Sequence, residues 1–246
     1  IGAARRALLH FVDVARTPVT GASVTIAGGA AATRNSTVSV ATPAQRAVRL
    51  ALSNDGRHWR ELPYAASISW SLTSATYGGT STNGTKTVHV RWQDATGRWT
   101  PAQTDRITFD TRAPTATAPV ARFVPGSTAS SRGVAVRLTW TGEDVGAGVA
   151  SYEVARSRSG GPWATVATGL ASPATTVSLP TSGSERFRVR ARDRAGNVGA
   201  WVAGAAFEVR GVSELSSSVA YAGRWTTRGE TGAWGGRLRF AAAAGA

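Results

Sequence analysis

Several residue types are missing or scarce in this chain of 246 residues, and each absence excludes a kind of chemistry. There is no cysteine, so disulfides, thiolate metal sites, iron–sulfur clusters and cysteine nucleophiles are excluded. The three histidines, His10, His58 and His89, are far apart in the sequence, which argues against a multi-histidine metal site. Methionine is absent and the chain opens on Ile1, so we expect a fragment or a processed chain. No apolar run approaches the roughly 20 residues that a spanning helix needs, so we expect no transmembrane segment.

Negative charge is also scarce, and almost all of the positive charge is arginine. The chain has 28 Lys and Arg against 14 Asp and Glu, a formal net charge of +14, and Lys86 is its one lysine. Such an excess attracts polyanions, either nucleic acid or an anionic wall polymer. A dedicated nucleic-acid domain would concentrate the charge, whereas here it is spread evenly. We therefore expect no dedicated nucleic-acid binding and consider a polysaccharide or anionic cell-wall polymer as partner. The alternative is that the many arginines reflect GC-rich codon usage, which needs no anionic partner.

Catalytic and cofactor motifs are missing as well. The sequence has no Gly-Xaa-Ser-Xaa-Gly elbow, His-Glu-Xaa-Xaa-His motif, phosphate loop or dinucleotide fingerprint. Its adjacent acidic pair, Glu143 and Asp144, lies in the glycine-rich segment 142–148 and is interpreted as a solvated turn, with calcium as the alternative. We predict no catalytic residue, no cofactor and no metal site, and hence no enzyme in the chain as given.

Alternating apolar residues over most of the chain predict an all-β fold. The runs from Ile68 to Leu72 and from Val88 to Trp92 alternate with polar residues, and turns such as Asn54-Asp55-Gly56 separate such runs. Short strands at this spacing predict antiparallel β-sandwiches. Residues 1–17 instead carry a short helical pattern, which we interpret as the tail of an upstream region.

An internal repeat is the strongest signal in the sequence. An offset of 99 places Val90 on Val189 and Asp94 on Asp193 without a gap. Two prolines at the start of the second copy predict a linker. The predicted organisation is a tail at 1–17, β-sandwiches at 18–113 and 114–210, and a partial third β domain at 211–246.

Particular segments of both copies carry a family resemblance. The second copy contains Ser151-Tyr152-Glu153-Val154, Gly160-Gly161-Pro162-Trp163 and the run from Phe187 to Trp201. With these, residues 114–210 resemble a bacterial fibronectin type III domain. The first copy contains Ser53-Asn54-Asp55-Gly56, Trp59 and the run from Asp94 to Trp99, and resembles a related bacterial Ig-like domain. Residues 219–225 and 235–240 resemble the first strands of a carbohydrate-binding-like β-sandwich, here in truncated form.

The resemblance implies a place and a role for the chain. The Asp110 to Pro114 linker is typical of repeat arrays in secreted bacterial surface proteins and in wall-active or polysaccharide-active enzymes. An extracellular or cell-surface location is therefore expected, with a non-catalytic role as spacer, adhesion or binding segment. The alternative is the accessory carbohydrate- or wall-binding portion of a larger hydrolase whose catalytic domain lies outside this chain.

A row of arginines is the first candidate binding site. In a strand, residues that alternate with an apolar set point to the opposite face, about 6.6 Å apart, and could grip a polyanion. The structural alternative is that Glu153 and Glu208, expected on the same face, pair with two of the four. The matching residues of the first copy differ, so we do not expect the site to recur. The four arginines are Arg186, Arg188, Arg190 and Arg192.

Tryptophans are the second group of candidates, because a flat ring complements a sugar face. Trp70, Trp92 and Trp140 have the apolar parity of their strands and are expected in the core. Trp59 and Trp163 follow equivalent tight turns and are expected to cover the core edge. The weak ligand-binding candidates are Trp99, Trp201, Trp225 and Trp234, the last two by resemblance.

Overall fold

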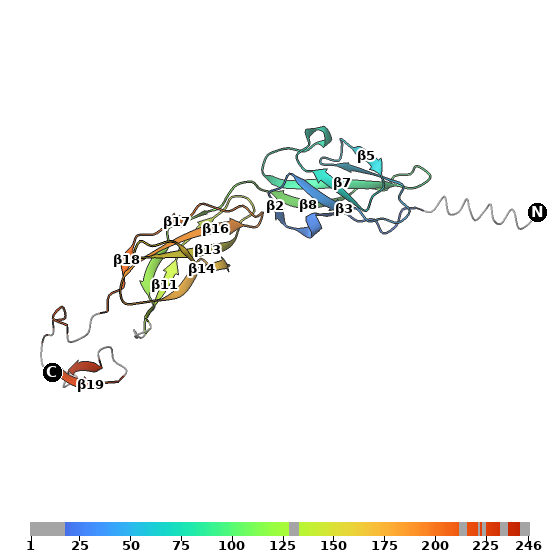
Figure 1. Cartoon of the computed structure of the whole chain (residues 1–246). Helices are drawn as coiled ribbons and strands as arrows, with labels where there is room; N and C mark the ends of the chain where they lie inside the picture. The colour runs from blue at the N-terminus through green and yellow to red at the C-terminus, as the bar shows by residue number, and fades with distance from the viewer. Residues whose placement is uncertain are drawn as a thin grey trace, which may run out of the picture. The chain divides into compact units, whose positions relative to one another are not determined.

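The computed structural model describes residues 18–127, 133–211, 216–220, 222, 225–231 and 236–241, and it confirms the all-β fold (Figure 1). The chain divides into two compact units. The first unit is Ile1–Ala113 with Asp144–Gly148 and Asp193–Asn197, and the second is Pro114–Glu143, Val149–Arg192 and Val198–Ala246. The helical pattern expected in the tail at 1–17 lies outside the described residues. Within them no helix is long and apolar enough to cross a membrane.

The first unit is a sandwich of a three-stranded and a five-stranded sheet. The small sheet has the order β1-β3-β6, and the large sheet has the order β2-β8-β7-β4-β5, in which the short β2 runs parallel to β8. Apolar side chains from both sheets meet in one core, because alternate residues of each strand point inward. The strands are β1 (Thr25–Ile26), β2 (Ala32–Thr33), β3 (Thr37–Ala41), β4 (Arg49–Ser53), β5 (Arg60–Pro63), β6 (Ser67–Ser71), β7 (Gly84–Gln93) and β8 (Gln103–Phe109), with 3-10 turns η1 (Ala27–Gly29) and η2 (Ala75–Tyr77).

The second unit repeats this plan. Its small sheet has the order β10-β11-β15, and its large sheet has the order β14-β13-β16-β17, with β18 also paired to β16. A separate core fills the space between these sheets. The strands are β9 (Thr115–Ala116), β10 (Val120–Phe123), β11 (Val134–Thr139), β12 (Gly142–Glu143), β13 (Val149–Arg158), β14 (Ala164–Leu170), β15 (Ala174–Leu179), β16 (Ser184–Asp193), β17 (Val202–Ala203) and β18 (Phe207–Glu208).

Equivalent strands confirm the internal repeat. β7 lies between β4 and β8, as β16 lies between β13 and β17. Val90 of β7 and Val189 of β16 are both fully buried. The tryptophans expected in the core are there as well, since Trp70, Trp92 and Trp140 expose at most 5% of their surface. The period-two pattern therefore assigned these residues to the inner faces of their strands correctly.

Lys86 lies on the inward side of β7, near one end of the first core. It is 8% exposed, and burial lowers the pKa of its ammonium group. The Nζ atom donates 2.7 Å hydrogen bonds to the carbonyl and to the hydroxyl of Thr80. The positive charge is thus buried with two acceptors, and it lies 5.8 Å from the centre of the Phe109 ring.

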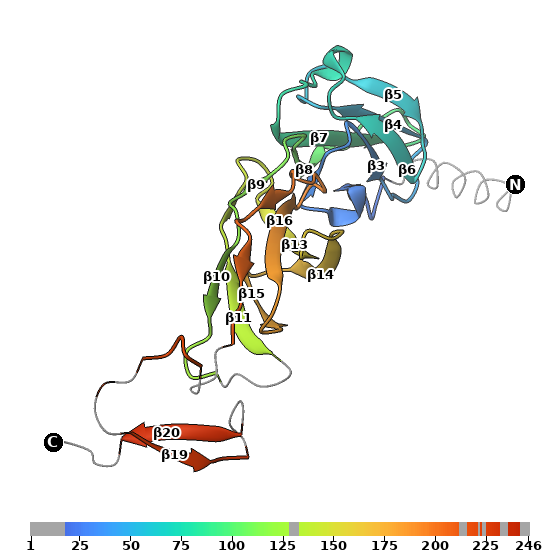
Figure 2. The same ribbon diagram turned by 60° about the vertical axis from the view of Figure 1, so that its left-hand side comes forward.

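The described part after residue 216 contains one antiparallel hairpin, β19 (Trp225–Gly229) and β20 (Arg237–Ala241), drawn side by side in Figure 2. Two strands alone do not form a sandwich. The third, carbohydrate-binding-like domain therefore stays a prediction. Trp234, one of its candidate residues, lies outside the described residues.

Candidate functional site

The four arginines of β16 lie on the outer side of the large sheet of the second unit. Phe187, Val189 and Ala191, which alternate with them, are at most 2% exposed and belong to the core. Arg186 and Arg192 are exposed, whereas the two central arginines are half-buried. The central pair is half-buried because aromatic rings from neighbouring loops cover it.

Arg188 and Arg190 form a stack with two tryptophans, which we call the arginine–tryptophan ladder (Trp163, Arg188, Trp201, Arg190). The guanidinium carbon of Arg188 is 4.5 Å from the Trp163 ring centre and 4.3 Å from the Trp201 ring centre. The guanidinium carbon of Arg190 is 4.5 Å from the Trp201 ring centre. Each contact is a cation–π interaction, which contributes about 0.5–2 kcal/mol according to its exposure.

A carboxylate completes one end of the ladder. Arg190 donates to Glu153 Oε2 from Nε, at 2.7 Å, and its Nη2 lies 2.5 Å from the same oxygen. Arg186 donates from Nε to the carbonyl of Gly204, at 3.0 Å. Glu208, expected to pair with a second arginine, is exposed and forms no ion pair with any described residue. One of the two expected acidic partners is therefore in place.

The first unit has the same kind of arginine–tryptophan stack, which the sequence comparison did not predict. The guanidinium carbon of Arg91 in β7 is 4.4 Å from the Trp59 ring centre and 4.7 Å from the Trp99 ring centre. The offset of the repeat aligns Arg91 with Arg190. In its contact with two tryptophan rings, however, Arg91 resembles Arg188. The arginine row itself does not recur, since Thr87, His89 and Gln93 stand where the second copy has Arg186, Arg188 and Arg192, and the expectation that no anion site recurs there stays a prediction.

Two of the tryptophan candidates, Trp99 and Trp201, are thus in contact with arginines. Trp99 and Trp201 are half-buried, as expected for partly exposed rings, and Trp59 and Trp163 cover arginines rather than the core edge. A guanidinium over a ring occupies the face that a sugar would need. Trp225 is 43% exposed, and its indole N–H donates to the Ala222 carbonyl at 2.6 Å.

A buried ion pair lies on the inner side of β16. Glu185 is fully buried, and its two carboxylate oxygens accept 2.5 Å hydrogen bonds from Nε and Nη2 of Arg156 in β13. Arg158 approaches the same carboxylate at 3.7 Å. The hydrogen bonds that Arg156 donates to the Glu185 carboxylate raise the pKa of Arg156. This pair holds β13 and β16 together and is not accessible to a ligand.

Comparisons with known proteins yield fold likeness alone. No protein-family model matches the chain, and no curated protein matches it. The chain is similar to the fibronectin(III)-like modules of Clostridium thermocellum CbhA, at 13% identity and a TM-score of 0.42, over 74% of this chain and 92% of that one. It is similar to a titin domain segment, at 16% identity and a TM-score of 0.46, over 77% of this chain and 66% of that one. It is similar to the chicken CNTN1 FN1–FN3 domains, at 13% identity and a TM-score of 0.45, over 73% of this chain and 62% of that one. The β-sandwich type of each unit rests on its own strand order, and no ligand or activity is carried over.

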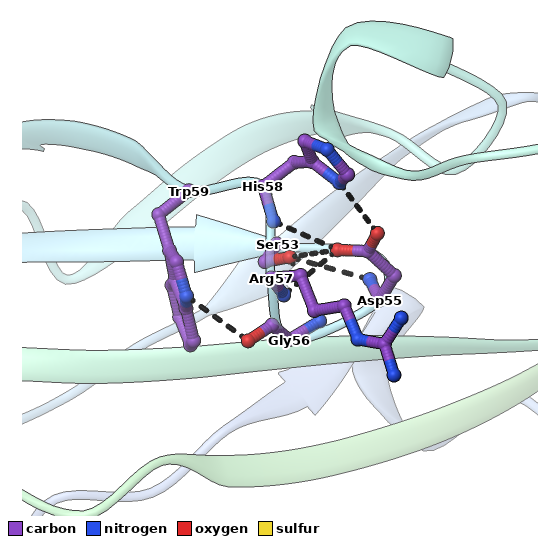
Figure 3. Close-up of polar contacts among 6 residues, drawn as sticks. All are labelled: Ser53, Asp55, Gly56, Arg57, His58 and Trp59. Carbon is purple, nitrogen blue, oxygen red and sulfur yellow. Dashed lines mark hydrogen bonds and ion pairs between the residues drawn. The ribbon is translucent and has the colours of Figure 1, made fainter.

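The polar turn after β4 contains a histidine–carboxylate pair, formed by His58 and Asp55. The Asp55 carboxylate accepts hydrogen bonds from the backbone N–H groups of Arg57 and His58, both at 2.9 Å, and lies 2.7 Å from His58 Nδ1 (Figure 3). The hydroxyl of Ser53 donates to Asp55 and accepts from two backbone N–H groups, so it is part of the turn and not a nucleophile. The backbone N–H of His58, and then its imidazole, hold the pKa of Asp55 well below its usual range.

Acid should therefore weaken the first unit. Because the pKa of Asp55 is depressed by folding, its contribution is complete above the unfolded value of about 3.9 and is lost as the pH falls below it. Urea unfolding of the full chain at pH 5, 4 and 2.5, followed through the amide signal of Val90, should show declining stability. Asp55→Asn should flatten this decline, and equal slopes in both proteins would contradict the assignment.

Three carboxylates gather in the first unit, a feature that sequence reasoning missed. One oxygen each from Asp110, Asp144 and Asp193 lies within 4.8 Å of the others, and the first and last of these residues are buried. Oxygen ligands of this type suit Ca²⁺. The same carboxylates already accept amide hydrogen bonds, among them from Ala147 N–H at 2.7 Å and Asn197 N–H at 2.8 Å. These donors account for the burial of the charges, and we assign no metal role.

Proposed function

We propose that the chain is a non-catalytic spacer and binding segment of a secreted, surface-exposed bacterial protein, with sandwiches at 18–113 and 114–210 and a partial third β domain at 211–246. The observation that supports this most strongly is that each unit has its own core. One core runs from Ile26 to Ile107 and the other from Val134 to Val209, and the two share no residue. A unit with its own core keeps its shape without its neighbour.

Strand length supports a spacing role. β7, β13 and β16 each have 10 residues, so each sandwich has strands about 33 Å long at about 3.3 Å per residue. Each unit therefore adds a rigid length to the protein that contains it. Exposed faces of the sheets, which the cores do not need, remain for contacts with a partner.

Pulling the full chain from its two ends should give two separate unfolding events. Each event should release roughly 300 Å of chain, because about 95 residues extend to roughly 3.6 Å each, less the folded length of about 35 Å. Single-molecule force spectroscopy measures both. Trp92→Ala is the matched control, since it should lower the force of one event and leave the other unchanged. A single event that releases both lengths together would contradict the proposal.

A second candidate function is the accessory wall-polymer-binding portion of a larger hydrolase. What favours it is the charge of the β16 outer face, where four arginines meet one paired glutamate. A basic, rigid face suits an anionic polymer. The arginine variants described below test this candidate.

A further inference from the structure

We propose that each unit carries one oxyanion-binding site, formed by the guanidinium of Arg188 in the second unit and by that of Arg91 in the first. The guanidinium carbon of each lies 4.3–4.7 Å from the centres of two tryptophan rings. Each guanidinium would bind one phosphate or carboxylate group of a linear polymer. The inference goes beyond the spacer role, which requires no ligand.

Rigid placement is the first argument. Contact with two rings restricts the guanidinium, so much of the entropy of ordering the arginine side chain is lost on folding and not on binding. A fixed planar fork matches the two oxygens of a carboxylate or phosphate, and bidentate pairs of this kind are stronger than single neutral hydrogen bonds. The stacking leaves the edges of the guanidinium as its only hydrogen-bonding surface.

Missing acceptors are the second argument. Neither the Arg91 nor the Arg188 side chain forms a hydrogen bond or ion pair with any described residue, and the Nε atom of each is buried without an acceptor. Their Nη atoms are not among the buried atoms without a partner, so these atoms reach solvent. The open edge is therefore the one between Nη1 and Nη2, where an oxyanion can bind end-on.

Arg190 shows within the same ladder what a satisfied guanidinium looks like. It stacks on Trp201 as Arg188 does, and it binds the carboxylate of Glu153. Arg188 has the same aromatic contact without the carboxylate. A ligand oxyanion would give Arg188 the partner that the protein supplies to Arg190.

Nearby acidic groups do not compete for the two sites. Glu153 is bound to Arg190, and Glu61, which lies across Ala51 from Arg91, is bound to Arg49 at 3.2 Å. Exposed arginines at 186 and 192 flank the site of the second unit. The local field therefore favours an anion.

Side-chain ¹H–¹⁵N NMR of the full chain tests the sites directly, because a buried Nε–H exchanges slowly with water. Titration with sodium polyphosphate, and separately with polygalacturonate, should shift the Nε–H signals of Arg91 and Arg188 with saturation. The signal of Arg190 should stay in place, because Glu153 occupies its fork. Saturation with polyphosphate alone identifies phosphate as the ligand group, and saturation with polygalacturonate alone identifies carboxylate; either result supports the proposal.

Two variants of Arg188 distinguish bidentate hydrogen bonding by the guanidinium from the effect of its positive charge. Arg188→Gln should abolish saturable binding in the second unit, and Arg188→Lys, which keeps the charge but loses the fork, should weaken it at least about tenfold. The Arg91 signal serves as internal control in both. The proposal is overturned if the Arg91 and Arg188 signals of the unmodified chain do not shift. It is also overturned if Arg188→Lys binds as tightly as the unmodified chain, or if the signals of Arg190 and of the exposed Arg98 shift as much as that of Arg188. The wild-type titration decides if a variant fails to fold. Two unfolding events under force would persist in any of these cases, so this failure is distinct from failure of the spacer role.

Discussion

Replacing Glu185 with glutamine should lower the free energy of unfolding of the second unit by about 3 kcal/mol, the order expected when one partner of a buried ion pair is removed. Glu185 is fully buried and binds Arg156 through both oxygens at 2.5 Å. In the variant, the guanidinium of Arg156 remains beside a neutral amide that can accept only part of its hydrogen bonds. The cost is that of leaving a partly desolvated charge without its counter-ion.

Urea unfolding of the full chain, followed through the amide signal of Val189, measures this loss. Glu61→Gln is the matched control, because the Arg49–Glu61 pair is about half exposed and such pairs contribute roughly 0–1 kcal/mol. Replacing both partners, as in Arg156→Leu with Glu185→Leu, should restore part of the lost stability. An effect of Glu185→Gln no larger than that of Glu61→Gln would show that the buried pair does not hold β13 and β16 together.

Trp201→Ala should also destabilise the second unit strongly, by about 3 kcal/mol, because it removes a large ring and two cation–π contacts at once. The ring lies against both Arg188 and Arg190, so its loss leaves Arg190 without a ring contact and Arg188 with that of Trp163 alone. Trp201→Phe should lose only roughly half of the free energy of unfolding that Trp201→Ala loses, since a smaller ring still offers an aromatic face.

A double-mutant cycle of Trp201→Ala with Arg188→Gln should give a coupling energy of at least about 0.5 kcal/mol, because residues in contact are not additive. Trp225→Ala is the control, since Trp225 is 43% exposed and takes no part in the ladder. Additive losses in the cycle would mean that Trp201 contributes through burial alone.

Strand parity explains what the sequence could reveal. A side-chain period of two places Phe187 inside and Arg188 outside once the strand is recognised, and the same parity places Glu185 inside beside Phe187. The buried glutamate was thus readable from the sequence. Its partner was not, because β13 and β14 shift register between Tyr152 and Ala155, and this shift sets which residues of β13 face inward.

The arginine–tryptophan contacts depend on loops, which periodicity does not describe. Trp59 lies in the loop between β4 and β5, and Trp163 lies in the loop between β13 and β14. Trp99 and Trp201 follow turns at the ends of β7 and β16. The meeting of Trp59 and Trp99 over Arg91 joins residues that are distant in the chain. The three gathered carboxylates were missed for the same reason, since each alone is typical of an ordinary turn.

Because Lys86 is buried in the first core, arginine is the only basic side chain besides histidine on the described surface. A guanidinium stays protonated far above neutral pH, whereas an ammonium group begins to lose its proton near pH 10. The electrostatic attraction of this protein should consequently persist into alkaline conditions in which a lysine-rich surface would discharge. Ionic strength, not alkali, should then be the variable that weakens binding of the anionic polymer proposed above.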